Sequence, residues 1–238
     1  MSVWLQREAS TAAAARVFCV PHAGSGTSVF DSWPAIRDGV EFLPVELPGR
    51  LSRFTERPPP TLNDLAAAMV AGLDRYLDVP FAFFGHCWSA ILAYEVTHQL
   101  ERAGATPTRL FVSAEVPPQV GPSGRMLDMD ETELAAEVAT TIRAAGKNPH
   151  PELVSIYVRI LRNDIELRRR YTASSPLRLV CPITAFGWSE DGEYGPDEMA
   201  GWAECGDITF TLFPGHHDRF RDAPPELIDT ICAGLRTP

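Results

Sequence analysis

The sequence predicts an α/β protein with a mostly parallel central sheet flanked by helices. Apolar runs rich in β-forming residues alternate with segments of helical period along the chain, which is typical of a parallel sheet covered by helices. Gly, Pro, His or an acidic residue stands at or near the end of each apolar run, where open α/β sheets place their functional sites. A length of 238 residues suits a single core, and we expect residues 1–238 to form one domain.

Six β-strands are expected from these runs. Their sequences are ARVFCVPHA (15–23), EFLPVELPG (41–49), FAFFGH (81–86), RLFVSAE (109–115), CPITAFG (181–187) and ITFTLFPG (208–215). Between the strands, helices are expected over Leu62–Leu77 and Trp88–Ala103. The proline triplet at 58–60 is interpreted as a rigid turn before the first of these helices.

The interval between the fourth and fifth expected strands is too long for an ordinary strand-to-helix connection, which takes roughly 2 to 6 residues. It contains two helical segments, Glu131–Ala145 and Pro151–Tyr171. One apolar stripe of the second segment consists of Leu153, Ile156, Ile160, Leu167 and Tyr171. A helical insertion at the carboxyl edge of such a sheet is typical of a lid, which we expect over about residues 116–178. A packed helical hairpin is equally consistent with this periodicity.

The composition argues against several classes of function. The chain has 45% hydrophobic and 22% charged residues and no run of 18 apolar residues, so no transmembrane helix is expected. The N-terminal segment lacks the apolar region of a signal peptide, and we expect a cytoplasmic protein. A formal net charge of -10 argues against nucleic acid as a partner. Five cysteines without CxxC spacing indicate neither a disulfide framework nor a metal site.

The segment FAFFGHCWSA (81–90) has the pattern of a nucleophile elbow, the strand–turn–helix motif of α/β-hydrolases. Its central residue is Cys87, which we expect to be the nucleophile. The elbow forces its central residue into strained backbone geometry and needs small neighbours, which Gly85 and Ser89 supply. A buried structural thiol is the alternative interpretation of Cys87.

Two backbone N–H groups are expected to form the oxyanion hole. The first belongs to Trp88, at the start of a helix, and the second to Ala23, in the glycine-containing loop PHAGSG (21–26) after the first strand. The alternative is that residues 21–26 form a simple glycine turn between strand and helix. This would explain the glycines but not their occurrence together with the nucleophile-elbow motif. His22 in this loop is expected to have a structural role.

The remaining catalytic groups are expected on loops after late strands, in the order nucleophile, acid, histidine. The last loop offers His216 and His217 as the base. Asp191 is the leading candidate for the acid that orients the imidazole, with Glu190 as its neighbour. Glu115 is a rival, because it ends the strand next to the nucleophile strand.

Two further features of the segment 151–171 carry charge. Asp164 falls on the apolar stripe, and we expect a buried hydrogen-bonding anchor there. Arg168, Arg169 and Arg170 end the helix, where basic residues favour the helix dipole; a phosphate-docking role is the alternative.

The chain resembles the external, or type II, thioesterases of polyketide and nonribosomal peptide assembly lines, which are α/β-hydrolases. The resemblance rests on the segments FCVPHAGSGTSVFDSWP, PVELPGRLSRFTERP, GHCWSA, VRILRNDIELRRRY, CPITAFGWSED and FPGHHDRF. It implies that His217, the last histidine of the FPGxH pattern, is the catalytic base. It also implies that Asp191, at the fifth position after the Phe of AFG, is the catalytic acid.

The resemblance further implies a substrate, a partner and a reaction. Such enzymes hydrolyse acyl thioesters on the phosphopantetheine arm of acyl or peptidyl carrier proteins, in editing or product release. They need no metal and no organic cofactor. We expect the chain to act as a monomer on carrier-bound acyl groups.

Serine is the usual nucleophile in this family, and Cys87 replaces it here. A thiol beside a histidine can form a thiolate–imidazolium pair with a depressed thiol pKa. The acyl-enzyme is then itself a thioester, close in energy to the carrier-bound substrate. Three hypotheses follow: a hydrolase, an acyltransferase or release enzyme with a non-water acceptor, and a carrier-binding protein of weak activity.

Overall fold

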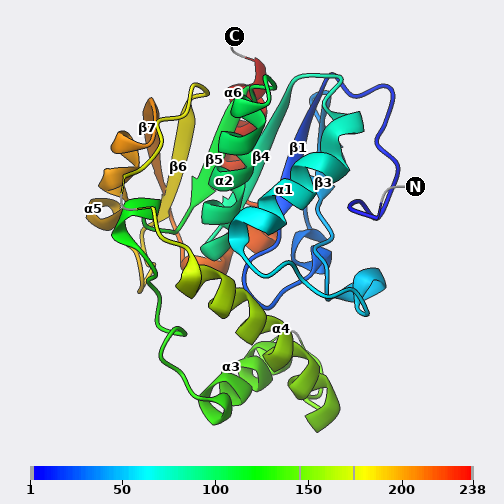
Figure 1. Ribbon diagram of the computed structural model, residues 1–238, viewed down its shortest axis with the longest axis vertical. Helices are drawn as coiled ribbons and strands as arrows, with labels where there is room; N and C mark the ends of the chain where they lie inside the picture. The colour runs from blue at the N-terminus through cyan, green and yellow to red at the C-terminus, as the bar shows by residue number, and fades with distance from the viewer. Residues whose placement is uncertain (1–2, 145, 174, 237–238) are drawn as a thin grey trace.

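The computed structural model describes residues 3–144, 146–173 and 175–236, and its centre is a seven-stranded sheet (Figure 1). The strands are β1 (Ala15–Val20), β2 (Ile36–Arg37), β3 (Val40–Pro44), β4 (Phe81–His86), β5 (Arg109–Ser113), β6 (Ile183–Trp188) and β7 (Ile208–Phe213). Their order across the sheet is β2-β3-β1-β4-β5-β6-β7. Only the β2–β3 pair is antiparallel among these strands, so the carboxyl ends of the other six lie at one edge.

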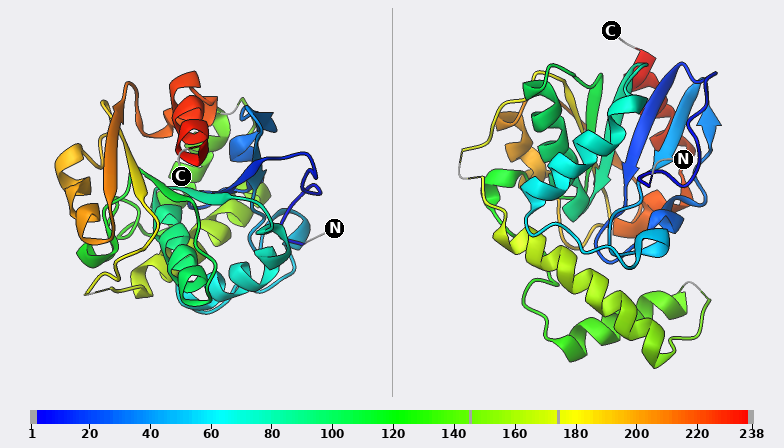
Figure 2. Two further views of the ribbon diagram at one scale, coloured as in Figure 1. Left: turned by 90° about the horizontal axis from the view of Figure 1, so that it is seen from above. Right: turned by 45° about the vertical axis from the view of Figure 1, so that its right-hand side comes forward.

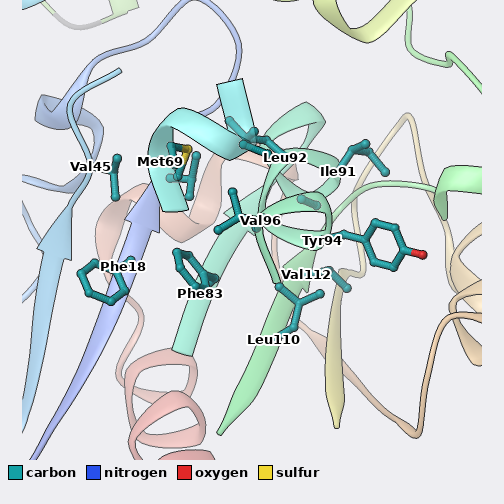
Figure 3. Packing of buried hydrophobic residues seen from close by; sticks show 14 of the residues in the cluster. Phe18, Val45, Met69, Phe83, Ile91, Leu92, Tyr94, Val96, Leu110 and Val112 are labelled. Carbon is teal, nitrogen blue, oxygen red and sulfur yellow. The ribbon is translucent and has the colours of Figure 1, made fainter. Parts of the chain in front are cut away.

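Helices cover both faces of the sheet (Figures 1 and 2). The α-helices are α1 (Leu62–Leu73), α2 (Trp88–Arg102), α3 (Glu131–Ala144), α4 (Pro151–Arg170), α5 (Pro196–Met199) and α6 (Pro225–Arg236). Helices α1 and α2 lie on one face, and α6 lies on the other. Strand residues alternate between the two sides, as the period of two requires. Figure 3 shows Phe18, Phe83 and Leu110 on the face that packs against α1 and α2.

Helices α3 and α4 form a helical hairpin beyond the carboxyl ends of the strands (Figure 1). An apolar cluster joins them, formed by Leu134, Val138 and Ile142 of α3 with Val158, Leu161 and Ile165 of α4. The apolar stripe predicted for α4 is wrong at Ile156, which is 37% exposed. The buried stripe includes Leu161 and Ile165 instead, because the position of α3 decides which side of α4 is covered.

The six predicted strands and the four predicted helices are confirmed, with differences at their ends. The strand predictions run past the observed carboxyl ends into loops; EFLPVELPG, for example, ends as a strand at Pro44. Helix α1 ends at Leu73 and continues as a 3-10 turn, and Ala145, the predicted end of α3, lies outside the described residues.

Three of these strands and α-helices were not predicted: β2, α5 and α6, of which α5 has only four residues. Strand β2 is too short to show a period, and it exists through antiparallel pairing with β3. Helix α6 has a helical spacing of apolar residues that could have been recognised: Leu227, Ile228, Ile231, Cys232 and Leu235. Among the described residues, no helix combines the length and apolar character needed to cross a bilayer.

The contact between β4 and α2 predicts a strong effect for Gly85→Ala. A Cβ at Gly85 would lie 2.4 Å from the carbonyl oxygen of Ser89, so strand and helix would have to separate. We expect a loss of at least about 2 kcal/mol in the free energy of unfolding, measured by urea denaturation. Gly192→Ala is the control, because a Cβ there meets no atom within 4 Å. Equal stability of both variants would contradict the prediction.

Candidate active site

Cys87 lies in a sharp turn between β4 and α2. Its backbone has φ 55° and ψ -143°, an unfavourable conformation for a residue with a Cβ. Its N–H donates to the carbonyl oxygen of Ser113 at the end of β5, at 2.9 Å. The half-buried thiol is therefore presented at the carboxyl edge of the sheet, as the nucleophile-elbow motif predicts.

Ser89 fixes this turn with its hydroxyl group. The side chain is fully buried, and its Oγ accepts the His86 N–H at 3.0 Å. The same Oγ lies 2.9 Å from the carbonyl oxygens of His86 and of Val20 in β1, and its single proton serves one of them at a time. Ser89 was expected only to be small enough; the structure adds a polar link between the turn and β1.

His217 and Asp191 lie together beside Cys87. The Nδ1 of His217 is 2.8 Å from Asp191 Oδ2, so Nε2 is the ring nitrogen left for Cys87, and the imidazole and the thiol lie close enough to shift each other's pKa. The second carboxylate oxygen, Oδ1, accepts the N–H groups of Glu193 and Tyr194 at 2.8 and 3.2 Å. These contacts hold the carboxylate in one orientation and direct the imidazole toward the sulfur.

The alternative candidates have other surroundings. His216 and Glu190 are exposed. Glu115 is buried, and its Oε1 lies 3.4 Å from Arg168 Nη2 and 3.3 Å from Ser123 Oγ. Within the described part of the chain, Glu115 shares no hydrogen bond with the imidazole of His217. The geometry thus brings Asp191, rather than Glu115, to the histidine.

The two expected oxyanion donors lie next to the thiol. Trp88 is the first residue of α2, and its N–H lies close enough to the Cys87 thiol to lower the thiol pKa. Ala23 lines the same cavity as Cys87, in a loop closed by a hydrogen bond from the Ser25 N–H to the His22 carbonyl at 3.1 Å. Both N–H groups therefore belong to turns at the same edge of the sheet.

His22 packs in an aromatic group that supports this edge. Its ring is edge-on to Phe220 at 5.8 Å, and His86 stacks on the same phenyl ring at 4.0 Å. Burial lowers the pKa of His22 to about 4, although Asp218 opposes the shift. A neutral, packed imidazole fits the structural role expected for His22.

Burial and charge act in opposite directions on the Cys87–His217 pair. Burial raises the pKa of the Cys87 thiol above its ordinary value, outweighing the effects of His217 and the Trp88 N–H, which lower this pKa. Burial also opposes a charged His217, but Asp191 and Cys87 outweigh it and raise the pKa of His217 to about 11. For Asp191, hydrogen bonds from His217 and two backbone N–H groups outweigh burial and lower the pKa. The two groups are coupled, because a thiolate raises the pKa of the imidazole beside it and an imidazolium lowers the pKa of the thiol.

Two charged groups of α4 are buried against the core. Asp164 is 2% exposed and hydrogen-bonded to Arg50, which confirms the predicted anchor. Arg168 is also buried and donates to the carbonyl of Gly121 at 2.5 Å in addition to Glu115. Burial raises the pKa of Glu115 to about 7, although Arg168 opposes the shift. Arg168 thus pairs with the core, unlike the exposed Arg169 and Arg170.

A cavity of about 500 Å³ connects the thiol with the helical hairpin. Cys87, Trp88 and His217 line one side, and apolar residues of α3 and α4 line another: Val138, Ile142, Leu161 and Ile165. This volume is typical of small-molecule sites. No group of three or more His, Cys, Asp or Glu side chains in the described ranges could hold a metal ion.

The chain is similar along nearly its whole length to proteins of known sequence or structure. Residues 15–235 match the family model described as Thioesterase domain. The gramicidin S biosynthesis protein GrsT of Aneurinibacillus migulanus is 28% identical over 236 residues, covering 95% of this chain and 91% of GrsT. The type II thioesterase BorB from the borrelidin biosynthetic cluster superposes with a TM-score of 0.85 at 29% identity, covering 98% of both chains. RedJ, a thioesterase of the prodiginine pathway in Streptomyces coelicolor, has a TM-score of 0.80 at 30% identity and the same coverage. The predicted α/β-hydrolase fold is confirmed.

Asp191→Asn is expected to make the protonated form of His217 less stable and, through it, the thiolate form of Cys87. Without the carboxylate the pKa of His217 falls and that of Cys87 rises, so the midpoint of Cys87 alkylation by iodoacetamide moves about 1 unit up in pH. The difference in the free energy of unfolding between wild type and Asp191→Asn should be greatest between about pH 4 and 6.5. It is lost as pH falls through the lowered pKa of Asp191, and as pH rises through that of His217 near 11. Glu190→Gln, at the exposed neighbouring position, is the control; an equal shift there would contradict this role for Asp191.

Glu115→Gln is expected to shift the same midpoint in the opposite direction. The Glu115 charge raises the pKa of Cys87, so a neutral amide that still accepts from Arg168 lowers that pKa. The alkylation midpoint should move down by about 0.5 pH units. The other four cysteines are buried, so alkylation reports Cys87. An upward shift would instead indicate that Glu115 supports the imidazolium.

Proposed function

The chain belongs to the thioesterase domain family, and on that premise we propose that it is a type II thioesterase. Its substrates are acyl thioesters on the phosphopantetheine arm of acyl or peptidyl carrier proteins of polyketide or nonribosomal peptide assembly lines. BorB is described as a type II thioesterase, and GrsT as a gramicidin S biosynthesis protein. The resemblance of this chain to both along nearly their whole lengths supports the same class of activity here.

The observation that carries the proposal is the alignment of Asp191, His217 and Cys87 in the wall of the cavity that reaches the helical hairpin. A nucleophile, a base held in one tautomer and an orienting carboxylate are the parts that acyl transfer requires. The hairpin side of the cavity offers apolar surface for an acyl chain, while the thiol lies on the other side.

Acylation begins with one proton between Cys87 and His217. His217 Nε2 holds this proton as the sulfur attacks the thioester carbonyl, and Asp191 stabilises the imidazolium. The N–H groups of Ala23 and Trp88 stabilise the oxyanion. The bond between the carbonyl carbon and the pantetheine sulfur then breaks, and His217 returns the proton to the leaving thiolate.

Deacylation completes hydrolysis with the same residues. Water loses a proton to His217 and attacks the acyl group on Cys87. The carbon–sulfur bond breaks, and the proton returns to the sulfur as the free acid leaves. Through these two steps, Cys87, His217 and Asp191 are restored to their starting states.

The sulfur of Cys87 favours a second candidate function, acyl transfer to a non-water acceptor. A thioester acyl-enzyme is close in energy to the carrier-bound thioester, so exchange between the two sulfurs is nearly reversible. A serine ester would lie lower in energy and commit the acyl group to hydrolysis. An acyl shuttle or a release enzyme would use the same triad with a thiol or an amine in place of water.

Intact-protein mass spectrometry tests the hydrolase and the transferase together. An acyl-phosphopantetheinyl carrier protein is mixed with wild type, Cys87→Ala or Cys87→Ser, with and without a second, unloaded carrier. We expect wild type to convert the acyl group to free acid at a rate independent of the second carrier, and Cys87→Ala to lower that rate at least about 100-fold. In Cys87→Ser, any acyl group found on residue 87 should be bound as an oxyester.

Other outcomes would change the assignment. An adduct on Cys87 that clears only when the second carrier or an amine is supplied would establish the transferase. Turnover that persists unchanged in Cys87→Ala would exclude Cys87 as the nucleophile. Absence of turnover in wild type, with binding of the loaded carrier retained, would indicate a carrier-binding protein.

A further inference from the structure

A buried ion pair joins the helical hairpin to the loop that contains Ala23. Asp164 of α4 and Arg50, which follows β3, contact each other through Oδ1 and Nη2 at 2.6 Å, with side chains 2% and 5% exposed. Asp164 Oδ2 accepts the Gly24 N–H at 2.8 Å, and Arg50 Nη1 donates to the Ser25 carbonyl at 2.6 Å. Each member of the pair therefore also holds the backbone of the loop directly.

The packing at Gly24 restricts the same loop from the side of α4. Gly24 has φ +70°, and a Cβ at this position would lie 3.2 Å from the Cβ of Leu161. Leu161 precedes Asp164 by three residues, so one face of α4 supplies both the apolar contact and the hydrogen-bond acceptor. The loop has little room to move away from the position that these contacts define.

We propose that Asp164, oriented by Arg50, is a positioning residue that places the Ala23 N–H for oxyanion binding. The hydrogen bond from the Gly24 N–H fixes the peptide group between Ala23 and Gly24, and the hydrogen bond from Arg50 fixes the carbonyl of Ser25. Because Asp164 takes the Gly24 N–H, the Ala23 N–H is the loop donor left for the substrate. This inference rests on the proposed function, and it makes α4 part of the catalytic framework.

The test compares two reactions of the same thiol in wild type and Asp164→Asn. Acylation of Cys87 by the acetyl thioester of N-acetylcysteamine develops an oxyanion, whereas alkylation by iodoacetamide does not. An asparagine at position 164 has one uncharged acceptor oxygen, so it cannot replace both carboxylate oxygens that accept from Gly24 and Arg50. We expect the acylation rate of Asp164→Asn to fall about 10- to 100-fold, with a larger change in the maximal rate than in the thioester concentration at half-saturation. The alkylation rate should stay within about 2-fold of the wild-type rate at every pH.

Glu166→Gln is the matched control. It removes a carboxylate from the same helix, but Glu166 pairs only with Arg169 and Arg170 among the described residues. Both of its reactions should stay at wild-type rates. An unchanged acylation rate in Asp164→Asn would overturn the proposal. A parallel loss of acylation and alkylation would also overturn it, because a general disturbance of the thiol would then explain the effect.

Amide hydrogen exchange separates this proposal from the proposed function. We expect the Gly24 amide to exchange at least about 10-fold faster in Asp164→Asn than in wild type or Glu166→Gln, since its acceptor is weakened. If wild type transfers no acyl group to Cys87, the proposed function fails, and faster exchange still supports the restraint of the loop by Asp164. Unchanged exchange would overturn that restraint. Should Asp164→Asn unfold, Arg50→Lys replaces it in the two thiol reactions, with slower acylation and unchanged alkylation again expected, because lysine keeps the charge but cannot hold both Asp164 and the Ser25 carbonyl in the geometry of the guanidinium.

Discussion

The strained backbone at Cys87 is the constraint on which the rest of the site depends. A residue with a Cβ remains at φ 55° only where its surroundings over-determine that conformation. Here the hydrogen bond to Ser113 holds the turn from β5, and the Ser89 hydroxyl holds it from β1. Gly85 lets α2 approach β4 closely enough for both. The sulfur, the Trp88 N–H and the histidine loop meet at one point because the two flanking strands fix this turn.

The electrostatics of the site follow from the low exposure that this arrangement produces. Burial keeps a proton on Cys87, whereas Asp191 favours a proton on His217. A serine in the same turn would depend wholly on the base for activation, but a thiol has a pKa close enough to that of imidazole for the two to exchange one proton. The site therefore suits sulfur chemistry, although burial works against the thiolate.

The parts of the site that sequence alone predicts are those with local signals. Cys87, Asp191 and His217 each follow an apolar run, and parallel strands bring such positions to one edge. The pairing of Arg50 with Asp164 joins residues 114 positions apart, so no local pattern names the partner, although an acid on an apolar helix stripe indicates that one exists. The prediction that Ile156 belongs to the buried stripe was wrong for the same reason, since the placement of α3 decides which side of α4 is buried. The hydroxyl network of Ser89 also depends on a carbonyl of a distant strand.

The two helices of the hairpin differ in how they are attached, and this difference bears on how the protein can diverge. Helix α4 is bound to the core by buried ion pairs at Asp164 and Arg168, whereas α3 buries mainly apolar side chains against α4. Val138 and Ile142 of α3 line the cavity without contacting the reacting groups through any hydrogen bond among the described residues. Mutations accumulating in α3 can therefore alter which acyl chains fit, while α4 preserves the chemistry. Such a separation lets a lineage acquire new substrates one apolar substitution at a time.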